Sequence, residues 1–149
     1  MLRRDAIKKS AIIAAVAMGA SASIVNANEV KNVKAGMNRI KMKIQDPEKP
    51  TEHELKHSPE IKLGEIDTKG FTTVEISIGQ KGIIHPSVDN HWIDYIELWA
   101  DGKLVGKTEL EASISRGFDS YKVNLKGVTK LTAIAGCNLH GIWEDSISI

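Results

Sequence analysis

One stretch decides the fold: Trp92-Ile93-Asp94-Tyr95-Ile96-Glu97-Leu98-Trp99-Ala100-Asp101-Gly102. Its first nine residues are largely apolar on both faces, which is typical of a central strand in a sheet. The pair Asp101-Gly102 is a strong hairpin turn, so Lys103 to Leu110 is expected to run back beside that strand. An antiparallel pair of strands is therefore predicted at the centre of the fold.

Alternating polar and apolar residues predict further strands on both sides of this pair. They lie at 39–44, 73–78 and 121–126, with shorter ones at 131–135 and 146–149. After residue 27 no segment shows a clear helical stripe, and 46–59 is polar, holds three of the four prolines and is expected to be a loop or extended arm. The fold class predicted is all-β, a sandwich or barrel of about seven strands.

Residues 1–27 differ from the rest of the chain and predict a secretory signal peptide. A basic start is followed by an uncharged run from Ser10 to Asn28 that is rich in small and apolar residues. Cleavage sites of the A-x-A type end at Ala22 and Ala27. A membrane anchor is the competing interpretation, but the run is barely long enough to span a bilayer and contains Gly19. The second unit predicted is a domain of residues 28–149.

The start Arg3-Arg4-Asp5-Ala6-Ile7-Lys8-Lys9 resembles a twin-arginine signal, although Ala6 stands where a bulky apolar residue is more usual. The alternative is an ordinary basic start with two adjacent arginines. The twin-arginine interpretation predicts export of a folded protein to the periplasm, with no stable membrane association after cleavage.

Composition narrows the class of protein. The 149 residues include 20 basic and 19 acidic side chains, five histidines and one cysteine. Removing 27 residues leaves 122, with 16 basic and 18 acidic side chains, enough for one core. This balance argues against nucleic acid as a partner. The single cysteine excludes an internal disulfide and any metal centre built from four cysteines.

All five histidines and the cysteine fall in three segments: 52–59, 85–91 and 137–141. Each has a simple structural interpretation when taken alone. His53 and His57 are then a surface residue and a turn residue, and His85 and His91 are ordinary loop histidines. Cys137 is then a buried apolar thiol.

Taken together, the same residues predict a mononuclear metal site. An unpaired cysteine is a liability in an oxidising compartment, whereas a thiolate held by a metal is protected. Cys137-x-x-His140 offers sulfur and nitrogen to one ion, and His85-x5-His91 adds two nitrogens. One thiolate with three or four imidazoles exceeds the four ligands of structural zinc. Because Met37 and Met42 are distant in sequence from Cys137, these donors suit iron better than blue copper.

Three motifs in order resemble the superoxide reductases, namely neelaredoxin and the catalytic domain of desulfoferrodoxin. They are Lys56-His57-x-Pro59, His85-Pro86-x4-His91-Trp92-Ile93-x-Tyr95 and Cys137-Asn138-Leu139-His140-Gly141-Ile142-Trp143. The resemblance runs from about Pro47 to the C-terminus. It implies an immunoglobulin-like β-sandwich with one non-haem iron that cycles between Fe2+ and Fe3+.

The resemblance also implies the roles of the site residues. His57, His85, His91 and His140 would bind iron in one plane, and Cys137 would be the axial thiolate. The open sixth position would take superoxide, which is reduced by one electron to hydrogen peroxide. A small redox protein would supply that electron. Relatives are commonly homodimers or homotetramers, and the single cysteine means that this chain is of the one-iron type.

Two further residues receive catalytic roles from the resemblance. Lys56 is in register with the lysine of the family motif Glu-Lys-His-x-Pro and would attract superoxide. The glutamate that binds ferric iron in many relatives is replaced here by Leu55. Glu54 lies one residue further back and would need a local bulge to take that role.

Two other classes of function remain open on the sequence. One is a non-catalytic electron-transfer or metal-carrier module, for copper in particular, which needs fewer histidines. The other is a carrier protein that uses Cys137 as a covalent attachment point, which requires a reactive thiol.

Overall fold

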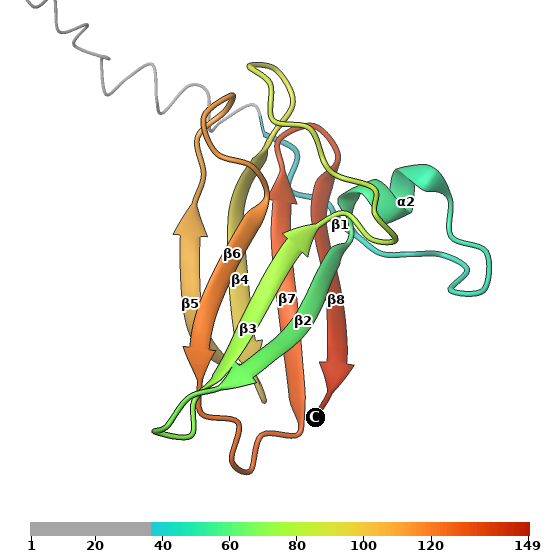
Figure 1. Cartoon of the computed structure of the whole chain (residues 1–149). Helices are drawn as coiled ribbons and strands as arrows, with labels where there is room; N and C mark the ends of the chain where they lie inside the picture. The colour runs from blue at the N-terminus through green and yellow to red at the C-terminus, as the bar shows by residue number, and fades with distance from the viewer. Residues whose placement is uncertain (1–36) are drawn as a thin grey trace, which may run out of the picture. The chain divides into compact units, whose positions relative to one another are not determined.

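The structure, a computed structural model, describes residues 37–149, so the predictions made for residues 1–27 lie outside the described part (Figure 1). Residues 37–149 form eight strands and one helix. These are β1 (Lys41–Met42), α2 (Glu52–His57), β2 (Pro59–Ile66), β3 (Thr72–Ile78), β4 (Ile93–Ala100), β5 (Lys103–Glu109), β6 (Phe118–Val123), β7 (Lys130–Cys137) and β8 (Gly141–Ser148). One sheet has the order β1-β8-β7-β4-β5, and the other has the order β2-β3-β6.

The predicted central strand and hairpin are confirmed. β4 lies between β7 and β5 in its sheet, and Ala100 pairs with Lys103 across the turn. Asp101 and Gly102 both have positive φ, 44° and 77°, as a tight hairpin of this kind requires. Asp101 also accepts a hydrogen bond from the hydroxyl of Thr129, which fixes the turn to the start of β7.

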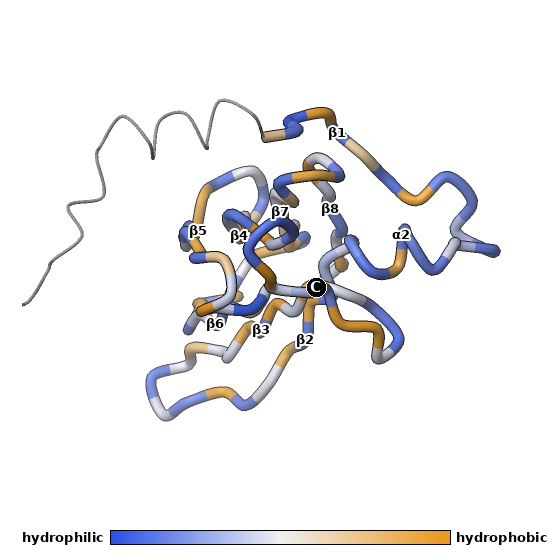
Figure 2. The backbone as a smooth tube through the Cα atoms, turned by 90° about the horizontal axis from the view of Figure 1, so that it is seen from above, coloured by the Kyte–Doolittle hydropathy of each residue, from blue (hydrophilic) through white to orange (hydrophobic). Residues whose placement is uncertain are grey.

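The core lies between the two sheets. Seen from above, the strands form two rows, with β5, β4, β7 and β8 in one and β6, β3 and β2 in the other (Figure 2). Val74 and Ile76 of β3 face Ile96 and Leu98 of β4 in one buried cluster, and all four are fully buried. Each such side chain contributes about 1.5–3 kcal/mol through burial. This confirms the all-β, immunoglobulin-like sandwich.

Several sequence predictions need correction. The strand expected at 121–126 is β6 at Phe118–Val123, and the one expected at 146–149 begins earlier, at Gly141, as β8. The segment 46–59 contains the helix α2, because Thr51 and Glu54 form a capping box that satisfies its first N–H groups. The strand expected at 39–44 shortens to β1, which pairs in parallel with β8. β2 was not predicted, since Gly64 interrupts it and only its first residues alternate in burial.

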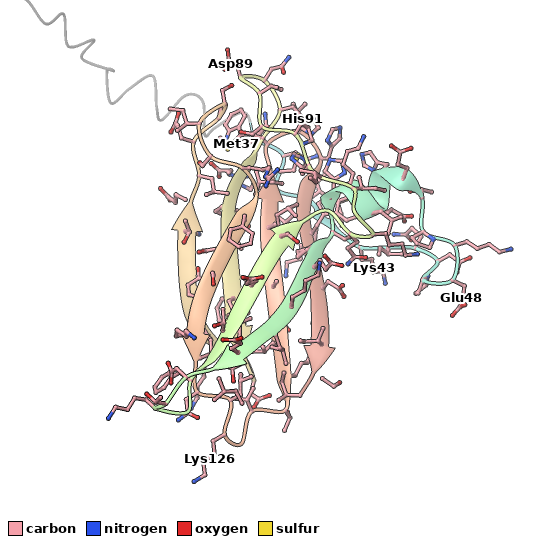
Figure 3. All side chains as sticks on the ribbon, in the orientation of Figure 1. Met37, Lys43, Glu48, Asp89, His91 and Lys126 are labelled. Atoms are coloured by element: carbon pink, nitrogen blue, oxygen red, sulfur yellow. The ribbon has the colours of Figure 1, made fainter. Side chains whose placement is uncertain are left out.

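The topology brings the three histidine- and cysteine-bearing segments to one end of the sandwich. α2 leads into β2, the 79–92 loop joins β3 to β4, and a short turn joins β7 to β8. Because these strands are antiparallel, those connections lie at the same end. Figure 3 shows His91 at this end and Lys126 at the other. Within residues 37–149, no helix is long and apolar enough to cross a membrane.

Candidate metal centre

Four histidine rings form a closed circuit at this end of the sandwich. The distances between the centres of neighbouring rings are 4.8 Å for His57–His85, 4.6 Å for His85–His91, 4.8 Å for His91–His140 and 4.6 Å for His140–His57. Neighbouring planes are inclined by 68 to 78°. The structure therefore brings together all four histidines that the sequence analysis singled out as ligands.

Four donor atoms converge most tightly, one each from His57, His91, Cys137 and His140, and all lie within 4.8 Å of one another. Nδ1 of His140 is 2.9 Å from Nε2 of His57 and 3.1 Å from Nε2 of His91. The sulfur of Cys137 lies 3.7 Å from the same Nδ1. These atoms come from three separate segments of the chain.

Backbone carbonyls orient two of the rings. Nδ1–H of His57 donates to the carbonyl of His53 at 2.6 Å, and Nδ1–H of His85 donates to that of Pro86 at 2.7 Å. Each ring then presents an unprotonated Nε2. Nε2 of His85 is buried and has no hydrogen-bond partner. A buried nitrogen without a partner is rare and calls for an explanation.

Burial keeps these rings neutral. Desolvation lowers the pKa of His57 to about 4 and that of His85 to about 3. It also lowers the pKa of His91 and His140, with the positive charge of Lys56 adding to the effect at both. Neutral imidazoles have free lone pairs, which is the form that binds metals.

Cys137 approaches the rings from the core. It ends β7, pairs with Ile93 of β4, and is fully buried. Burial raises the pKa of its thiol, while the backbone N–H groups of His140 and Leu139 act in the opposite direction. The N–H of His140 lies 3.4 Å from the sulfur. These N–H groups stabilise the thiolate form of Cys137. The sulfur is therefore positioned to bind a metal that displaces the thiol proton.

The donor set fits a single metal ion. Two nitrogens bound at right angles to one first-row metal, each about 2.1 Å away, lie about 3 Å apart. The separations of 2.9 and 3.1 Å around His140 agree with this spacing. Nε2 of His57 lacks a proton, so its lone pair is free to bind a cation at this spacing. A cation held here would also give the buried, unpartnered Nε2 of His85 a group to bind.

The two sides of the cluster differ in exposure. His57, His85 and Cys137 are buried, whereas His91 and His140 are partly exposed. On the exposed side, Lys56 lies close enough for its charge to act on His91 and His140. Its ammonium is 3.9 Å from the carboxylate of Glu52, and its side chain is 35% exposed. A small anion therefore meets positive charge on the open side.

Glu54 is engaged elsewhere. Its carboxylate accepts hydrogen bonds from the N–H of Gln45 at 2.8 Å and from the N–H and hydroxyl of Thr51 at 2.8 and 2.9 Å. The backbone N–H of Thr51, then that of Gln45, lowers its pKa, so it is ionised at the start of α2. Binding to ferric iron would require these bonds to break, and that role stays a prediction.

Three residues without a role in the sequence analysis lie against the cluster. The buried amide of Asn138 accepts from the N–H of Trp92 at 2.9 Å and donates to the carbonyl of Asn90 at 3.0 Å, which ties the Cys137 turn to the His91 loop. The ring of Trp143 stacks on His57 at 5.4 Å. The exposed ring of His53 lies 4.3 Å from that of His57. The types and sequence spacing of these three residues did not point to the site, because each contacts it only in the folded chain.

Known proteins match the chain over the region that contains this centre. A family model described as desulfoferrodoxin matches residues 49–146. The superoxide reductase of Thermococcus kodakarensis is 36% identical over 106 residues, which cover 63% of this chain and 87% of that protein. The superoxide reductase of Pyrococcus abyssi is 35% identical over 106 residues, with the same coverage of 63% and 87%.

Solved structures of superoxide reductases are also similar to this chain. The superoxide reductase of Giardia intestinalis has a TM-score of 0.55 and 29% identity, covering 63% of this chain and 98% of its own. That of Nanoarchaeum equitans has a TM-score of 0.56 and 28% identity, covering 66% and 97%. Because the family model spans most of the described residues and all five of the ligands predicted from the sequence, the chain belongs to the desulfoferrodoxin family, the family of the superoxide reductases.

Proposed function

We propose that residues 28–149 are an exported superoxide reductase. In this proposal, His57, His85, His91, His140 and Cys137 would hold a mononuclear iron, which would supply the one electron that, with two protons, converts superoxide to hydrogen peroxide. One observation carries the proposal. In a chain of this family, donor atoms of His57, His91, His140 and Cys137 lie within 4.8 Å of one another, and the ring of His85 lies beside those of His57 and His91.

Residues on the buried side of the cluster position the ligands, and residues on the exposed side give superoxide access. When bound, iron supplies a one-electron couple, and a thiolate ligand increases electron density on it. Cys137 holds its sulfur in the core, where water is excluded and the N–H of His140 fixes its position. The carbonyls of His53 and Pro86 keep Nε2 of His57 and His85 directed inward. This rigid arrangement limits reorganisation during electron transfer.

The exposed side of the cluster gives superoxide access to the centre. Superoxide is a small anion, so the charge of Lys56 beside His91 and His140 raises its local concentration although the mature chain is net negative. Solvent reaches the partly exposed rings of His91 and His140 and can deliver both protons. Hydrogen peroxide leaves by the same side.

Location and partners belong to the same proposal. Residues 1–27 would direct the chain to the periplasm through the twin-arginine route, which accepts folded proteins. A small exported redox protein would supply electrons to iron, and the protein would assemble as a homodimer or homotetramer. The partly exposed His91 and His140 would give such a donor an approach to the centre.

A second candidate is copper carriage or simple electron transfer. The observation in its favour is that the tightest donor set contains only His57, His91, Cys137 and His140. Three imidazoles and one thiolate resemble the donor types of a copper site. The two candidates differ over whether His85 is needed.

Metal analysis, a visible spectrum and product stoichiometry test the proposed function. Protein purified from the exported fraction is expected to contain about one iron per chain and to turn blue on oxidation, from sulfur-to-iron charge transfer. With a reductant present, each superoxide consumed is expected to yield one hydrogen peroxide. A yield of one peroxide for two superoxides would indicate dismutation, and copper in place of iron would support the second candidate.

Lys56→Ala is expected to slow superoxide capture by about threefold to tenfold at low ionic strength, because one steering charge is lost from the open side. The dependence of the rate on salt should flatten as well. Pulse radiolysis at several salt concentrations measures both quantities. Lys56→Arg keeps the charge and is the matched control. An unchanged rate for Lys56→Ala at low salt would remove the steering role.

A further inference from the structure

The turn from Cys137 to His140 has two hydrogen-bonding sides. On the inner side, the N–H of His140 lies 3.4 Å from the sulfur of Cys137, and the N–H of Leu139 also acts on it. Each N–H belongs to a peptide group whose carbonyl is that of the preceding residue. The carbonyls of Asn138 and Leu139 lie on the outer side of the turn. A group that hydrogen-bonds to them therefore also acts on the peptides whose N–H groups face the sulfur.

Asn38 binds both of these carbonyls. Its backbone N–H donates to the carbonyl of Asn138 at 2.8 Å, and its side-chain Nδ2 donates to that of Leu139 at 3.0 Å. The N–H of Ile40 donates to Oδ1 of Asn38 at 2.9 Å. This last bond fixes which end of the side-chain amide faces Leu139. One residue thus occupies the outer side of both peptides.

Hydrogen bonds in a chain polarise one another. A donor at a peptide carbonyl makes the N–H of the same peptide a stronger donor. Asn38 therefore strengthens the N–H groups that Leu139 and His140 direct at the sulfur of Cys137. Hydrogen bonds to a ligand sulfur reduce its electron donation and set the potential of the metal that it binds.

The segment that carries Asn38 is held in place independently of this contact. β1 pairs with β8, and the N–H of Ile142 donates to the carbonyl of Ile40 at 2.8 Å. Arg39 forms an ion pair of 2.6 Å with Asp94. Gly141, with φ of 87°, has no side chain that would collide with the carbonyl of Ile40. The segment lies before residue 49, where the family match begins.

We propose that Asn38 is a positioning residue that polarises the 138–139 and 139–140 peptides and thereby weakens electron donation by the Cys137 sulfur. The consequence is a higher reduction potential of the iron, because a weaker donor stabilises the ferrous form. This inference rests on the proposed function only in requiring that the centre holds iron. It adds a segment outside the matched region to the residues that set the properties of the centre.

The test measures both steps separately. In metal-free protein, Asn38→Ala is expected to move the backbone amide NMR signal of His140 toward weaker hydrogen bonding, because it removes the side-chain donor to the carbonyl of Leu139 and keeps the backbone N–H that binds the carbonyl of Asn138. In the iron-loaded full-length protein, it is expected to lower the midpoint potential, so that the ferric-to-ferrous ratio at a fixed potential rises several-fold. A tenfold change corresponds to about 59 mV for one electron. Asn38→Asp keeps the bond from Ile40 but loses the donor, so the potential should also fall.

Ile40→Ala is the matched control, because its side chain lies on the same segment and is 66% exposed. It should leave the amide signals and the potential unchanged. Equal shifts in the Asn38→Ala and Ile40→Ala proteins would show that loosening of β1 is the cause and would overturn the proposal. A wild-type potential in either Asn38 variant would do the same. Absence of superoxide reduction in the wild type would instead contradict the proposed function, while the NMR and potential measurements stay interpretable.

Discussion

Iron-loaded Cys137→Ala protein is expected to lose the blue ferric colour and to reduce superoxide at least about a hundredfold more slowly than the wild type. Loss of a residue that only supports a ligand commonly costs tenfold to a hundredfold, so loss of a ligand should cost at least as much. Cys137 supplies the sole sulfur of the donor cluster, and its side chain is fully buried. No other thiol in the chain can replace it.

The measurement is a visible spectrum, an iron determination and a superoxide assay on the same sample. Thermal unfolding of the metal-free proteins shows whether the core tolerates the change, and Cys137→Ser provides a second variant of nearly equal volume. Retention of both colour and activity by either variant would show that the sulfur is not a ligand. Rapid alkylation of Cys137 in the native wild type would instead support the carrier with a covalent attachment point, because a buried or metal-bound thiolate resists alkylation.

The centre of the fold was predictable because its signals are local. The stretch from Trp92 to Gly102 shows a strand pattern and a hairpin turn within eleven residues. Both follow from steric preferences of the backbone and from burial on two faces. β3 was predictable for the same reason, since its residues alternate strictly between buried and less buried positions.

Elements that depend on distant partners were not predictable. β2 is a strand because residues from Pro59 to Leu63 pair with β3, although its outer half is exposed and contains Gly64. α2 has only six residues, too few for a helical stripe, and is stabilised by its capping box and by burial of Leu55 and His57. The Thr51-x-x-Glu54 pattern was the available signal.

That the candidate ligands lie close together was predictable, but their orientation was not. Soft and imidazole donors at short spacing indicate a metal, whichever way the rings face. His57 presents Nε2 because a carbonyl four residues earlier takes its Nδ1–H, whereas His140 presents Nδ1. Asn38 reaches the Cys137 turn across 101 residues of sequence. Such contacts exist only in the folded chain.

The His85→Ala protein is expected to bind iron at least about tenfold more weakly and to lose most superoxide reduction, if the centre uses all four imidazoles. Nε2 of His85 is buried without a hydrogen-bond partner, and its ring lies between those of His57 and His91. Iron and copper titrations monitored by visible absorbance, together with the superoxide assay, measure the effect. A copper carrier built on the other four donors would tolerate the change.

Two variants make this result interpretable. His85→Phe fills the space of the imidazole without a nitrogen, so a loss of iron in both His85 variants cannot be attributed to a cavity. His53→Ala removes a ring 4.3 Å from His57 that is exposed and lies outside the donor set, and it should retain iron and activity. Normal iron binding and activity in both His85 variants would reduce the ligand set to three histidines and Cys137. Weaker copper binding in the same variants would show that four imidazoles are required whichever metal the chain carries.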